Sequence, residues 1–246
     1  MRWLLDWVGF LRTLLFTIPL IYLYTVVLGL VWALVLPFDP TGRRLHSLAR
    51  LWSRLILATS LVRVRRRGLE NLVPGQHYVY VANHQSYMDI PILFAYLPVP
   101  FRIMAKASLF SIPIVGWHLR RTGNLPISFT NVRADARRLL EAVRYIREGH
   151  SIVVFPEGRR SVSGGIEEFK TGIFLAALKA GAPIIPVTIR GTRRVLPRDS
   201  WTIRPGHVEL IFDSPVVTTG LGKERLDELV ARVRQRIEEN FLGGTP

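Results

Sequence analysis

His84 and Asp89 are the residues of this chain whose types and spacing point most directly to proton transfer. They lie five residues apart, and His84 follows an apolar run over 77–82 that predicts a buried strand. A neutral imidazole oriented by a carboxylate is the usual group that takes a proton from a hydroxyl near neutral pH. Since five residues on a helix turn the chain by about 140°, we expect His84 at the strand end and Asp89 in the first turn of the next helix. The alternative is a strand-end histidine without chemistry, followed by an aspartate that suits the helix dipole.

A second apolar run, 151–155, predicts another buried strand that ends in a tight turn. The turn is followed by Arg159, Arg160 and Ser161. An arginine binds phosphate in a forked, bidentate geometry that lysine cannot copy. Paired arginines in so basic a chain could be a solvated surface pair, but their place at a second strand end favours an anion site. One strand end therefore offers a base, and the other offers a phosphate-binding site.

These two segments resemble the signature blocks of the glycerolipid acyltransferases. Asn83–Asp89 matches the family's Asn-His-x4-Asp block, and Phe155–Ser161 matches its third block, Phe-Pro-Glu-Gly-Thr-Arg-Ser, with Arg159 in the threonine position. Ile184–Val187 is similar to the fourth block, an apolar strand with an inner proline. The resemblance covers roughly residues 63–212 and is strongest to the bacterial enzymes that acylate 1-acyl-glycerol-3-phosphate.

The second block of the family is where this chain departs from the pattern. In the family this block ends in an arginine after a short strand. Here the segment 123–128 leads to Phe129, and the nearest arginine is Arg133. Which residue fills this role stays open, and with it the headgroup of the acceptor.

Acyl transfer from a thioester to an alcohol needs a base, an orienter for the base and donors for the developing oxyanion. His84 is the expected general base and Asp89 its orienter, which is half of a hydrolase triad with the substrate's hydroxyl as the nucleophile. Ser86 is nearby, but Gly-x-Ser-x-Gly, the sequence typical of a serine nucleophile, is absent. Arg159 and Arg160 are expected to bind the phosphate of the acceptor.

Four further residues complete the expected substrate site. Glu157 is acidic among arginines, so we interpret it as an orienter of a guanidinium or as a ligand for the glycerol hydroxyl. Gly158 and Ser161 belong to the same block, which the resemblance places at the substrate. Lys106 extends the basic site, although a single lysine is more often an ordinary surface residue.

The charge balance indicates a polyanionic partner. Thirty-three basic side chains stand against eighteen acidic ones, a net charge of +15, which suits nucleic acid or an anionic membrane surface. The apolar N-terminus and the absence of basic–aromatic recognition motifs argue against nucleic acid. The chain has no cysteine, and its six histidines show no metal-binding spacing. We therefore expect no metal, and the resemblance implies no cofactor, with the thioester of acyl carrier protein or coenzyme A as cosubstrate.

The N-terminal region predicts a membrane anchor. The 24 residues Thr13–Leu36 carry no formal charge, and one helix of that length, about 36 Å, would cross the hydrocarbon core. No small-residue cleavage pattern follows, so an uncleaved anchor is expected. The segment Thr41–Ser60 is amphipathic, with its arginines on one arc, and either lies in the membrane interface or packs on the catalytic domain. A helical hairpin that dips into one leaflet is favoured over a full span, and both stay open.

The rest of the chain alternates between strands and helices, which predicts an α/β fold with a mixed, largely parallel sheet flanked by helices. Residues 1–60 are expected to form the anchoring helices and residues 61–246 the α/β acyltransferase domain. The strands are expected over 63–67, 78–82, 102–105, 125–127, 151–155, 184–189 and 208–212. The helices are expected over 87–96, 112–121, 131–148, 171–180 and 223–240.

These features lead to one expected function and to alternatives. The resemblance implies an acyltransferase at the cytoplasmic face of the membrane that converts lysophosphatidic acid to phosphatidic acid. Another lysophospholipid or an aminolipid could be the acceptor for the same chemistry. A non-catalytic, basic membrane-binding protein, or an esterase or thioesterase that uses the same pair on water, would also carry some of these features. The acyl donor, the chain length and the oligomeric state are not determined by the sequence.

Overall fold

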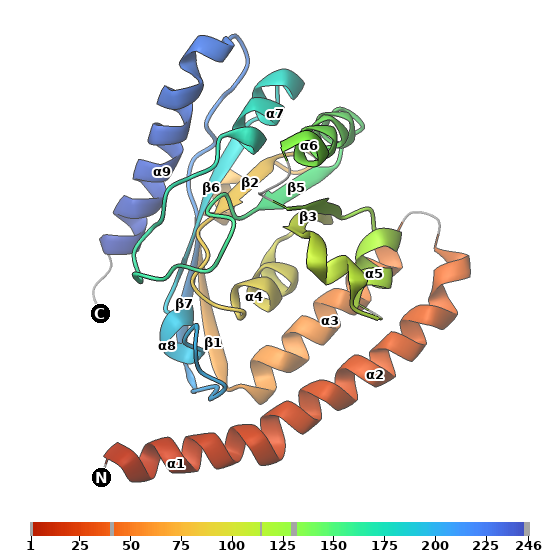
Figure 1. Ribbon diagram of the computed structural model, residues 1–246, viewed down its shortest axis with the longest axis vertical. Helices are drawn as coiled ribbons and strands as arrows, with labels where there is room; N and C mark the ends of the chain where they lie inside the picture. The colour runs from red at the N-terminus through yellow and green to blue at the C-terminus, as the bar shows by residue number, and fades with distance from the viewer. Residues whose placement is uncertain (1, 40–41, 114, 129–131, 244–246) are drawn as a thin grey trace. The chain divides into compact units, whose positions relative to one another are not determined.

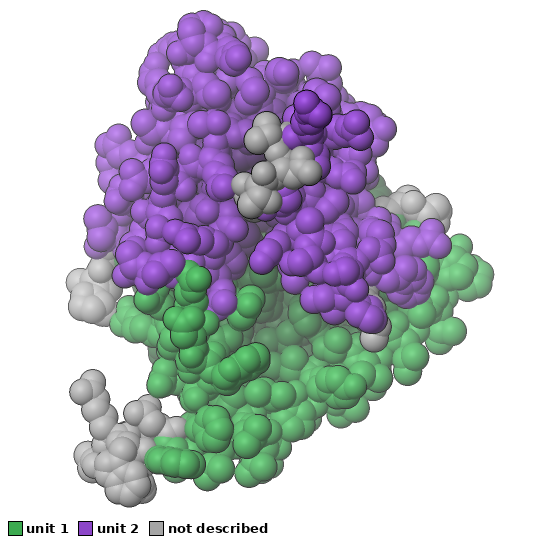
Figure 2. Space-filling view, viewed as in Figure 1, with its two compact units in different colours: residues 1–65, 85–98, 190–209 green, residues 66–84, 99–189, 210–246 purple. Residues whose placement is uncertain are grey.

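The computed structural model describes residues 2–39, 42–113, 115–128 and 132–243 (Figure 1). The chain divides into two compact units (Figure 2). The first comprises residues 1–65, 85–98 and 190–209, and the second comprises 66–84, 99–189 and 210–246. The sequence predicted an anchoring region over residues 1–60 and a catalytic domain over 61–246. That division is by function, whereas the two units are defined by compactness, so it stays a prediction.

The described residues form a sheet of seven strands in the order β1-β7-β6-β2-β5-β3-β4. In the middle of the sheet β2 pairs in parallel with β5 and β6, and β3 pairs in parallel with β4 and β5. Every residue of β2 and β5 is buried, as their continuous apolar runs predict for strands covered on both faces. The α/β fold with a mixed, largely parallel sheet is therefore confirmed. The strands are β1 Val62–Arg67, β2 Val79–Ala82, β3 Phe101–Lys106, β4 Leu125–Ile127, β5 Ser151–Val154, β6 Ile184–Arg190 and β7 Gly206–Phe212.

The second unit has one large apolar core. Alternate residues of β2, β5 and β6 present one face of the sheet, and α6, α7 and α9 pack their apolar sides against it (Figure 1). The strand residues in this core include Val79, Val81, Ile152, Val154 and Ile184, each almost completely buried. The helices and helical turns of this unit are η3 Leu69–Asn71, η4 Ala107–Ser111, α5 Val115–Arg121, α6 Val132–Arg147, α7 Gly172–Ala180, η5 Lys223–Arg225 and α9 Leu226–Leu242.

The first unit is built on a helical hairpin. Trp52 on α3 donates its indole N–H to the hydroxyl of Thr25 on α2 at 3.0 Å. The hydroxyls of Tyr24 and Thr59 also lie 2.9 Å apart, so α3 returns along α2. Leu45, Ile56 and Leu57 of α3 are buried, while Leu51 stays exposed. The ring centroid of His46 lies 5.7 Å from that of Phe94 on α4. The elements are α1 Arg2–Arg12, the π-helical segment η1 Thr13–Thr17, α2 Ile18–Val35, η2 Leu36–Phe38, α3 Arg43–Thr59, α4 Asp89–Tyr96 and α8 Thr192–Val195.

In the part of the chain that the structure describes, one helix, Trp7–Phe38, is long and apolar enough to cross a membrane. Few of its side chains are buried, and many are exposed: Leu30, for example, is 64% exposed. A long apolar helix that protein covers only in part suits a lipid environment. The helical hairpin expected from the sequence is confirmed, and its insertion into lipid stays a prediction.

One predicted helix begins later than expected. We expected a helix over 112–121, but a 3-10 segment ends at Ser111 and α5 begins only at Val115. Pro113 explains the break, because proline lacks an N–H and forces the preceding Ile112 into an extended conformation. The short helix α8, of four residues, was not predicted.

Candidate active site

The two strand ends singled out in the sequence belong to neighbouring strands. β2 and β5 are parallel and in register, with Val81 opposite Val154. The segments that follow them, starting at Asn83 and Phe155, therefore leave the sheet at the same edge. Ligands bind at this carboxyl edge in open α/β sheets.

Asn83 joins the end of β2 to the end of β6. Its side chain is completely buried. Its amide group donates to the carbonyl of Ile189 at 2.9 Å and accepts the N–H of Ile189 at 2.7 Å. This paired contact copies a backbone ladder beyond the point where β2 ends, and so it fixes the chain immediately before the histidine.

His84 is held by three contacts with the segment that follows β5. Its backbone N–H donates to Oε1 of Glu157 at 2.7 Å, and its carbonyl accepts the N–H of Ser161 at 2.8 Å. Its imidazole stacks on the ring of Phe155, with 4.1 Å between centroids and 22° between the planes. The third block of the sequence therefore positions the histidine of the first block from both sides of its backbone and from one face of its ring.

Glu157 has a role that the sequence did not predict. We expected it to orient a guanidinium or to bind a glycerol hydroxyl. Its carboxylate is 5% exposed, accepts the His84 N–H through Oε1 and accepts the N–H of Glu167 through Oε2 at 3.2 Å. Hydrogen bonds between a carboxylate and backbone N–H groups are strong because they are charge-assisted. Through these bonds Glu157 fixes the main chain at His84 and at Glu167.

Asp89 lies in the first unit, as the first residue of α4, in the helix first turn that the sequence predicted. It is completely buried, and its Oδ2 accepts the N–H groups of Gln85 at 2.7 Å and Ser86 at 2.9 Å. The N–H of Gln85 belongs to the peptide bond that follows His84. One carboxylate thus fixes the turn directly after the histidine. Ser86 is also buried, and its hydroxyl donates to the carbonyl of Leu196 at 2.7 Å, which gives it a structural role.

Arg159 and Arg160 lie on a loop with a well-defined backbone. Gly158 has a φ of +72° in the turn before them, a conformation that favours glycine. Ser161 after them is completely buried, and its hydroxyl accepts the N–H of Gly164 at 3.0 Å. Arg159 is exposed and Arg160 is half-buried, so both are presented by a fixed loop at the surface.

Glu167 closes this loop. Its carboxylate accepts the N–H groups of Val162 at 2.9 Å and Ser163 at 3.3 Å, and these bonds lower the pKa of the carboxyl from its usual value. The hydroxyl of Ser161 also lies 3.2 Å from the same oxygen. The sequence contained no signal for this residue, because an acidic side chain shortly after two glycines looks like an ordinary loop residue.

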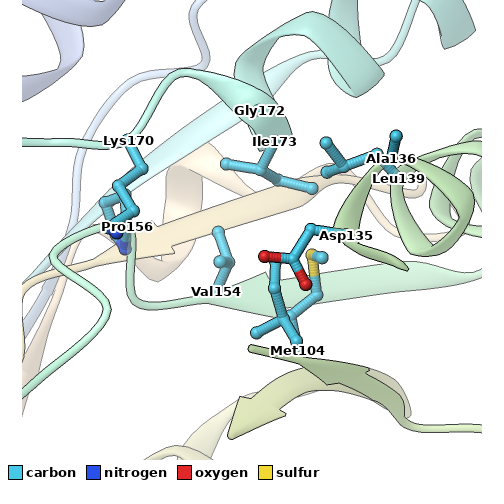
Figure 3. Close-up of a pocket in the computed structure, with 10 residues that line it drawn as sticks. Met104, Asp135, Ala136, Leu139, Val154, Pro156, Lys170, Gly172 and Ile173 are labelled. Atoms are coloured by element: carbon cyan, nitrogen blue, oxygen red, sulfur yellow. The ribbon is translucent and has the colours of Figure 1, made fainter. Parts of the chain in front are cut away.

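A cavity of about 250 Å³ opens in the second unit beside the same strand ends (Figure 3). Val154 and Pro156 come from β5 and the turn after it, and Lys170 lies next to Pro156 and donates its backbone N–H to the proline carbonyl at 3.0 Å. Most of the wall is apolar. The remaining lining residues are Met104, Ile127, Asp135, Ala136, Leu139, Gly172 and Ile173. The sequence did not reveal this cavity, because its wall comes from five separate elements, β3, β4, β5, α6 and α7, and from the loops beside them.

The other predicted site residues have mixed outcomes. Lys106 is exposed at the end of β3, with its Cα paired to that of Ile127 on β4, so it emerges at the carboxyl edge of the sheet. Phe129, at the position of the second-block arginine, lies outside the described residues. Before it, Ser128 donates both its N–H and its hydroxyl to Asp135, at 2.8 and 3.1 Å. Among the described residues, no three histidine or carboxylate side chains come together in a way that could hold a metal ion.

Comparison with known proteins places this arrangement in a family. Residues 63–190 match the family model described as Acyltransferase. The chain is 32% identical over 217 residues to a 1-acyl-sn-glycerol-3-phosphate acyltransferase of Salmonella typhimurium, covering 87% of this chain and 86% of that protein. It is 34% identical over 210 residues, 84% of this chain, to the chloroplastic 1-acyl-sn-glycerol-3-phosphate acyltransferase LPAT1 of Arabidopsis thaliana. The chain spans only 57% of that longer protein.

A solved structure is similar over almost the whole chain. The crystal structure of PlsC from Thermotoga maritima, a 1-acyl-sn-glycerophosphate (LPA) acyltransferase, has a TM-score of 0.80 and 28% sequence identity. The match covers 99% of this chain and 100% of that chain. The likeness therefore includes the N-terminal helices as well as the sheet.

Proposed function

Because this chain belongs to the acyltransferase family, we propose that it moves a fatty acyl group from a thioester to the free hydroxyl of 1-acyl-glycerol-3-phosphate, which gives phosphatidic acid. The bacterial and chloroplast relatives and the Thermotoga maritima structure are acyltransferases for this acceptor, which supports the assignment. The observation that carries the proposal is that the third block holds His84 by two hydrogen bonds. The Glu157 carboxylate accepts the His84 N–H, and the Ser161 N–H donates to the His84 carbonyl. His84 and the third block therefore lie together at one edge of the sheet.

In the proposed reaction His84 is the general base. Its imidazole takes the proton of the acceptor hydroxyl while the oxygen attacks the thioester carbonyl. The tetrahedral intermediate collapses, the C–S bond breaks, and the proton passes from the imidazolium to the departing thiolate. The products are the new ester and a free thiol, so no acyl-enzyme and no protein nucleophile are required.

Asp89 orients the imidazole and stabilises its protonated form in this proposal. Two observations support the assignment. The carboxylate is completely buried, and it already holds the peptide that follows the histidine. A buried carboxylate fixed to the turn after the histidine is suited to hold the imidazole in one orientation.

Arg159 and Arg160 bind the phosphate of the acceptor in this proposal, with Gly158 and Ser161 shaping the loop and Lys106 adding positive charge at the edge of the sheet. The loop around Glu167 supports this, because a fixed backbone presents the guanidinium groups with little loss of entropy on binding. The mostly apolar cavity beside Pro156 suits a hydrocarbon chain of a substrate.

The same proposal places the enzyme on a membrane. The exposed apolar helix Trp7–Phe38 anchors it, with the catalytic residues at the cytoplasmic face and with anionic lipids around the basic protein. The acyl donor is the thioester of acyl carrier protein or of coenzyme A, and no further cofactor takes part.

The test is an acceptor panel with purified protein in detergent, scored by the mass of the product. Lysophosphatidic acid, a second lysophospholipid and water alone are compared with one acyl thioester. Phosphatidic acid is the expected main product, and it should disappear in His84→Ala. Thioester hydrolysis without transfer, or equal use of an acceptor without a phosphate monoester, would refute the proposed acceptor.

A further inference from the structure

The loop that joins α8 to β7 carries the most exposed large apolar side chain among the described residues. Trp201 is 82% exposed, in a segment that runs from Arg198 to Arg204 and is called here the Trp201 loop. An indole left in water forgoes the burial of a large apolar surface. Exposed tryptophans with an apolar body and a polar N–H are enriched where protein meets the membrane–water interface.

The Trp201 loop is fastened to the N-terminal helix within the first unit. The backbone N–H of Ile203 donates to the hydroxyl of Thr13 at 3.1 Å. The carbonyl of Ile203 accepts a guanidinium N–H of Arg12 at 2.6 Å. Thr13 is only 1% exposed, on a helix whose other side chains are mostly exposed. The loop is therefore held at a defined level along the helix.

The Trp201 loop contacts the N-terminal helix where its charge-free run begins. Arg12 is the last charged residue before it, and Thr13 is its first residue. When such a helix enters a bilayer, its charged end stays in the headgroup region while the uncharged run lies in hydrocarbon. A loop hydrogen-bonded to both Arg12 and Thr13 lies at the boundary between the two regions, which is the depth that tryptophan prefers.

The charges of the Trp201 loop fit the same surroundings. Arg204 is exposed, and the Arg198 guanidinium lies 3.8 Å from the carboxylate of Asp199. An ion pair of this length contributes little to stability, and the two arginines add positive charge to the loop. Basic residues near an anionic membrane surface each gain about 1 kcal/mol of binding free energy.

We propose that the Trp201 loop is a second membrane-contact element, in which Trp201 enters the headgroup region of an anionic phospholipid bilayer and Arg204 faces the lipid phosphates. The inference rests on the membrane anchoring proposed above. The apolar helix alone sets the depth of the first unit but leaves its tilt against the bilayer open. A second contact at the headgroup level restricts that tilt and gives the first unit one orientation on the membrane.

The absence of cysteine from this chain makes a direct test simple, because each introduced cysteine carries the only label. Three single variants, Trp201→Cys, Leu30→Cys and Val217→Cys, receive a nitroxide and are bound to vesicles of phosphatidylcholine and phosphatidylglycerol. Leu30 reports on the anchor, and Val217, which is 64% exposed in the second unit, reports on a surface not expected to contact lipid. Spin-relaxation by oxygen and by a water-soluble nickel chelate gives the depth of each label.

We expect the label at 201 to lose contact with the chelate when vesicles are added and to report headgroup depth, between the deep label at 30 and the unchanged label at 217. A label at 201 that behaves like that at 217 while that at 30 is deep would overturn the inference and leave the anchor standing. If none of the labels is protected, the anchor and the inference both fail. Transfer activity in detergent, measured on the unlabelled protein, separates either result from a failure of the proposed reaction.

Trp201→Ala provides an independent measurement. The side chain is so exposed that its removal should leave thermal unfolding in detergent unchanged. We expect activity on vesicle-borne lysophosphatidic acid to fall severalfold while activity in mixed micelles stays the same. An equal loss in both assays, or no loss in either, would contradict the inference.

Discussion

The two strand ends of the site differ in how they are exposed. After β2, Asn83, Gln85, Ser86 and Asp89 are all at most 1% exposed, and the side chains of Asn83, Ser86 and Asp89 make hydrogen bonds. After β5, Arg159 is exposed and Arg160 is half-buried, while Glu157 and Ser161 beside them are buried. Fixed, desolvated groups suit proton transfer, because their geometry and electrostatics do not reorganise during the reaction. Exposed guanidinium groups suit the capture of a charged substrate. We therefore expect the first end to control turnover and the second to control acceptor affinity.

The largest effect is expected for His84 and Asp89. His84→Ala removes the proposed base, and general-base catalysis contributes about 10²–10⁴-fold, so turnover at saturating acceptor should fall by that factor. Asp89→Asn keeps the shape and removes the charge. Because groups that act as a unit are not additive, the double variant should be scarcely worse than His84→Ala. Transfer kinetics of the three variants test this, with thermal unfolding as the control. A folded His84→Ala protein with normal turnover would show that His84 is not the general base and that the first strand end does not control turnover.

Glu157 should affect both turnover and stability. Glu157→Gln weakens the charge-assisted bonds to His84 and Glu167, and such bonds contribute about 1.5–3 kcal/mol. The free energy of unfolding should fall by up to that amount, and turnover should fall about tenfold or more as the histidine loses its position. Glu168→Gln is the matched control, because this neighbouring carboxylate is exposed. A loss of acceptor affinity with normal turnover would instead favour the original interpretation of Glu157 as a substrate ligand.

The arginines should affect affinity more than turnover. Arg160→Ala removes a charge-assisted contact of about 1.5–3 kcal/mol, so the KM for lysophosphatidic acid should rise roughly ten- to a hundredfold. Arg159→Ala should have a smaller effect, because Arg159 stands where the family has threonine. Arg137→Ala, at an exposed position on α6, should change neither constant. An unchanged KM in either site variant would show that the residue was assigned wrongly.

The smallest effect is expected for Glu167. Its pKa is lowered in the folded protein by the N–H groups of Val162 and Ser163, so its contribution is present above the pKa of the unfolded chain and is lost as the pH falls through the folded value. Glu167→Gln removes this contribution at neutral pH. The melting temperature should fall slightly at pH 7, and the difference from the wild type should disappear at acid pH. A difference that persists below pH 4 would point to another role for this carboxylate.

Local patterns were sufficient for much of the fold. The apolar runs predicted β2 and β5 within a residue of their observed ends, and Gly181 stops α7 where expected. The N-terminal hairpin followed from a charge-free run next to an amphipathic one. The break at Pro113 was missed because the apolar pattern continued through it, although proline chemistry favoured a boundary there.

The sequence by itself determined which side chains carry the chemistry and that each follows a strand. Both properties are local, since residue type and apolar periodicity are written in a few consecutive positions. The tertiary structure alone decided that β2 and β5 are neighbours, and therefore that Glu157 holds the backbone of His84, 73 residues away. It also decided that Ile203 binds Thr13 across 190 residues. Strand order and long-range hydrogen bonds depend on how all elements bury their apolar faces together, and no single stretch of sequence contains that information.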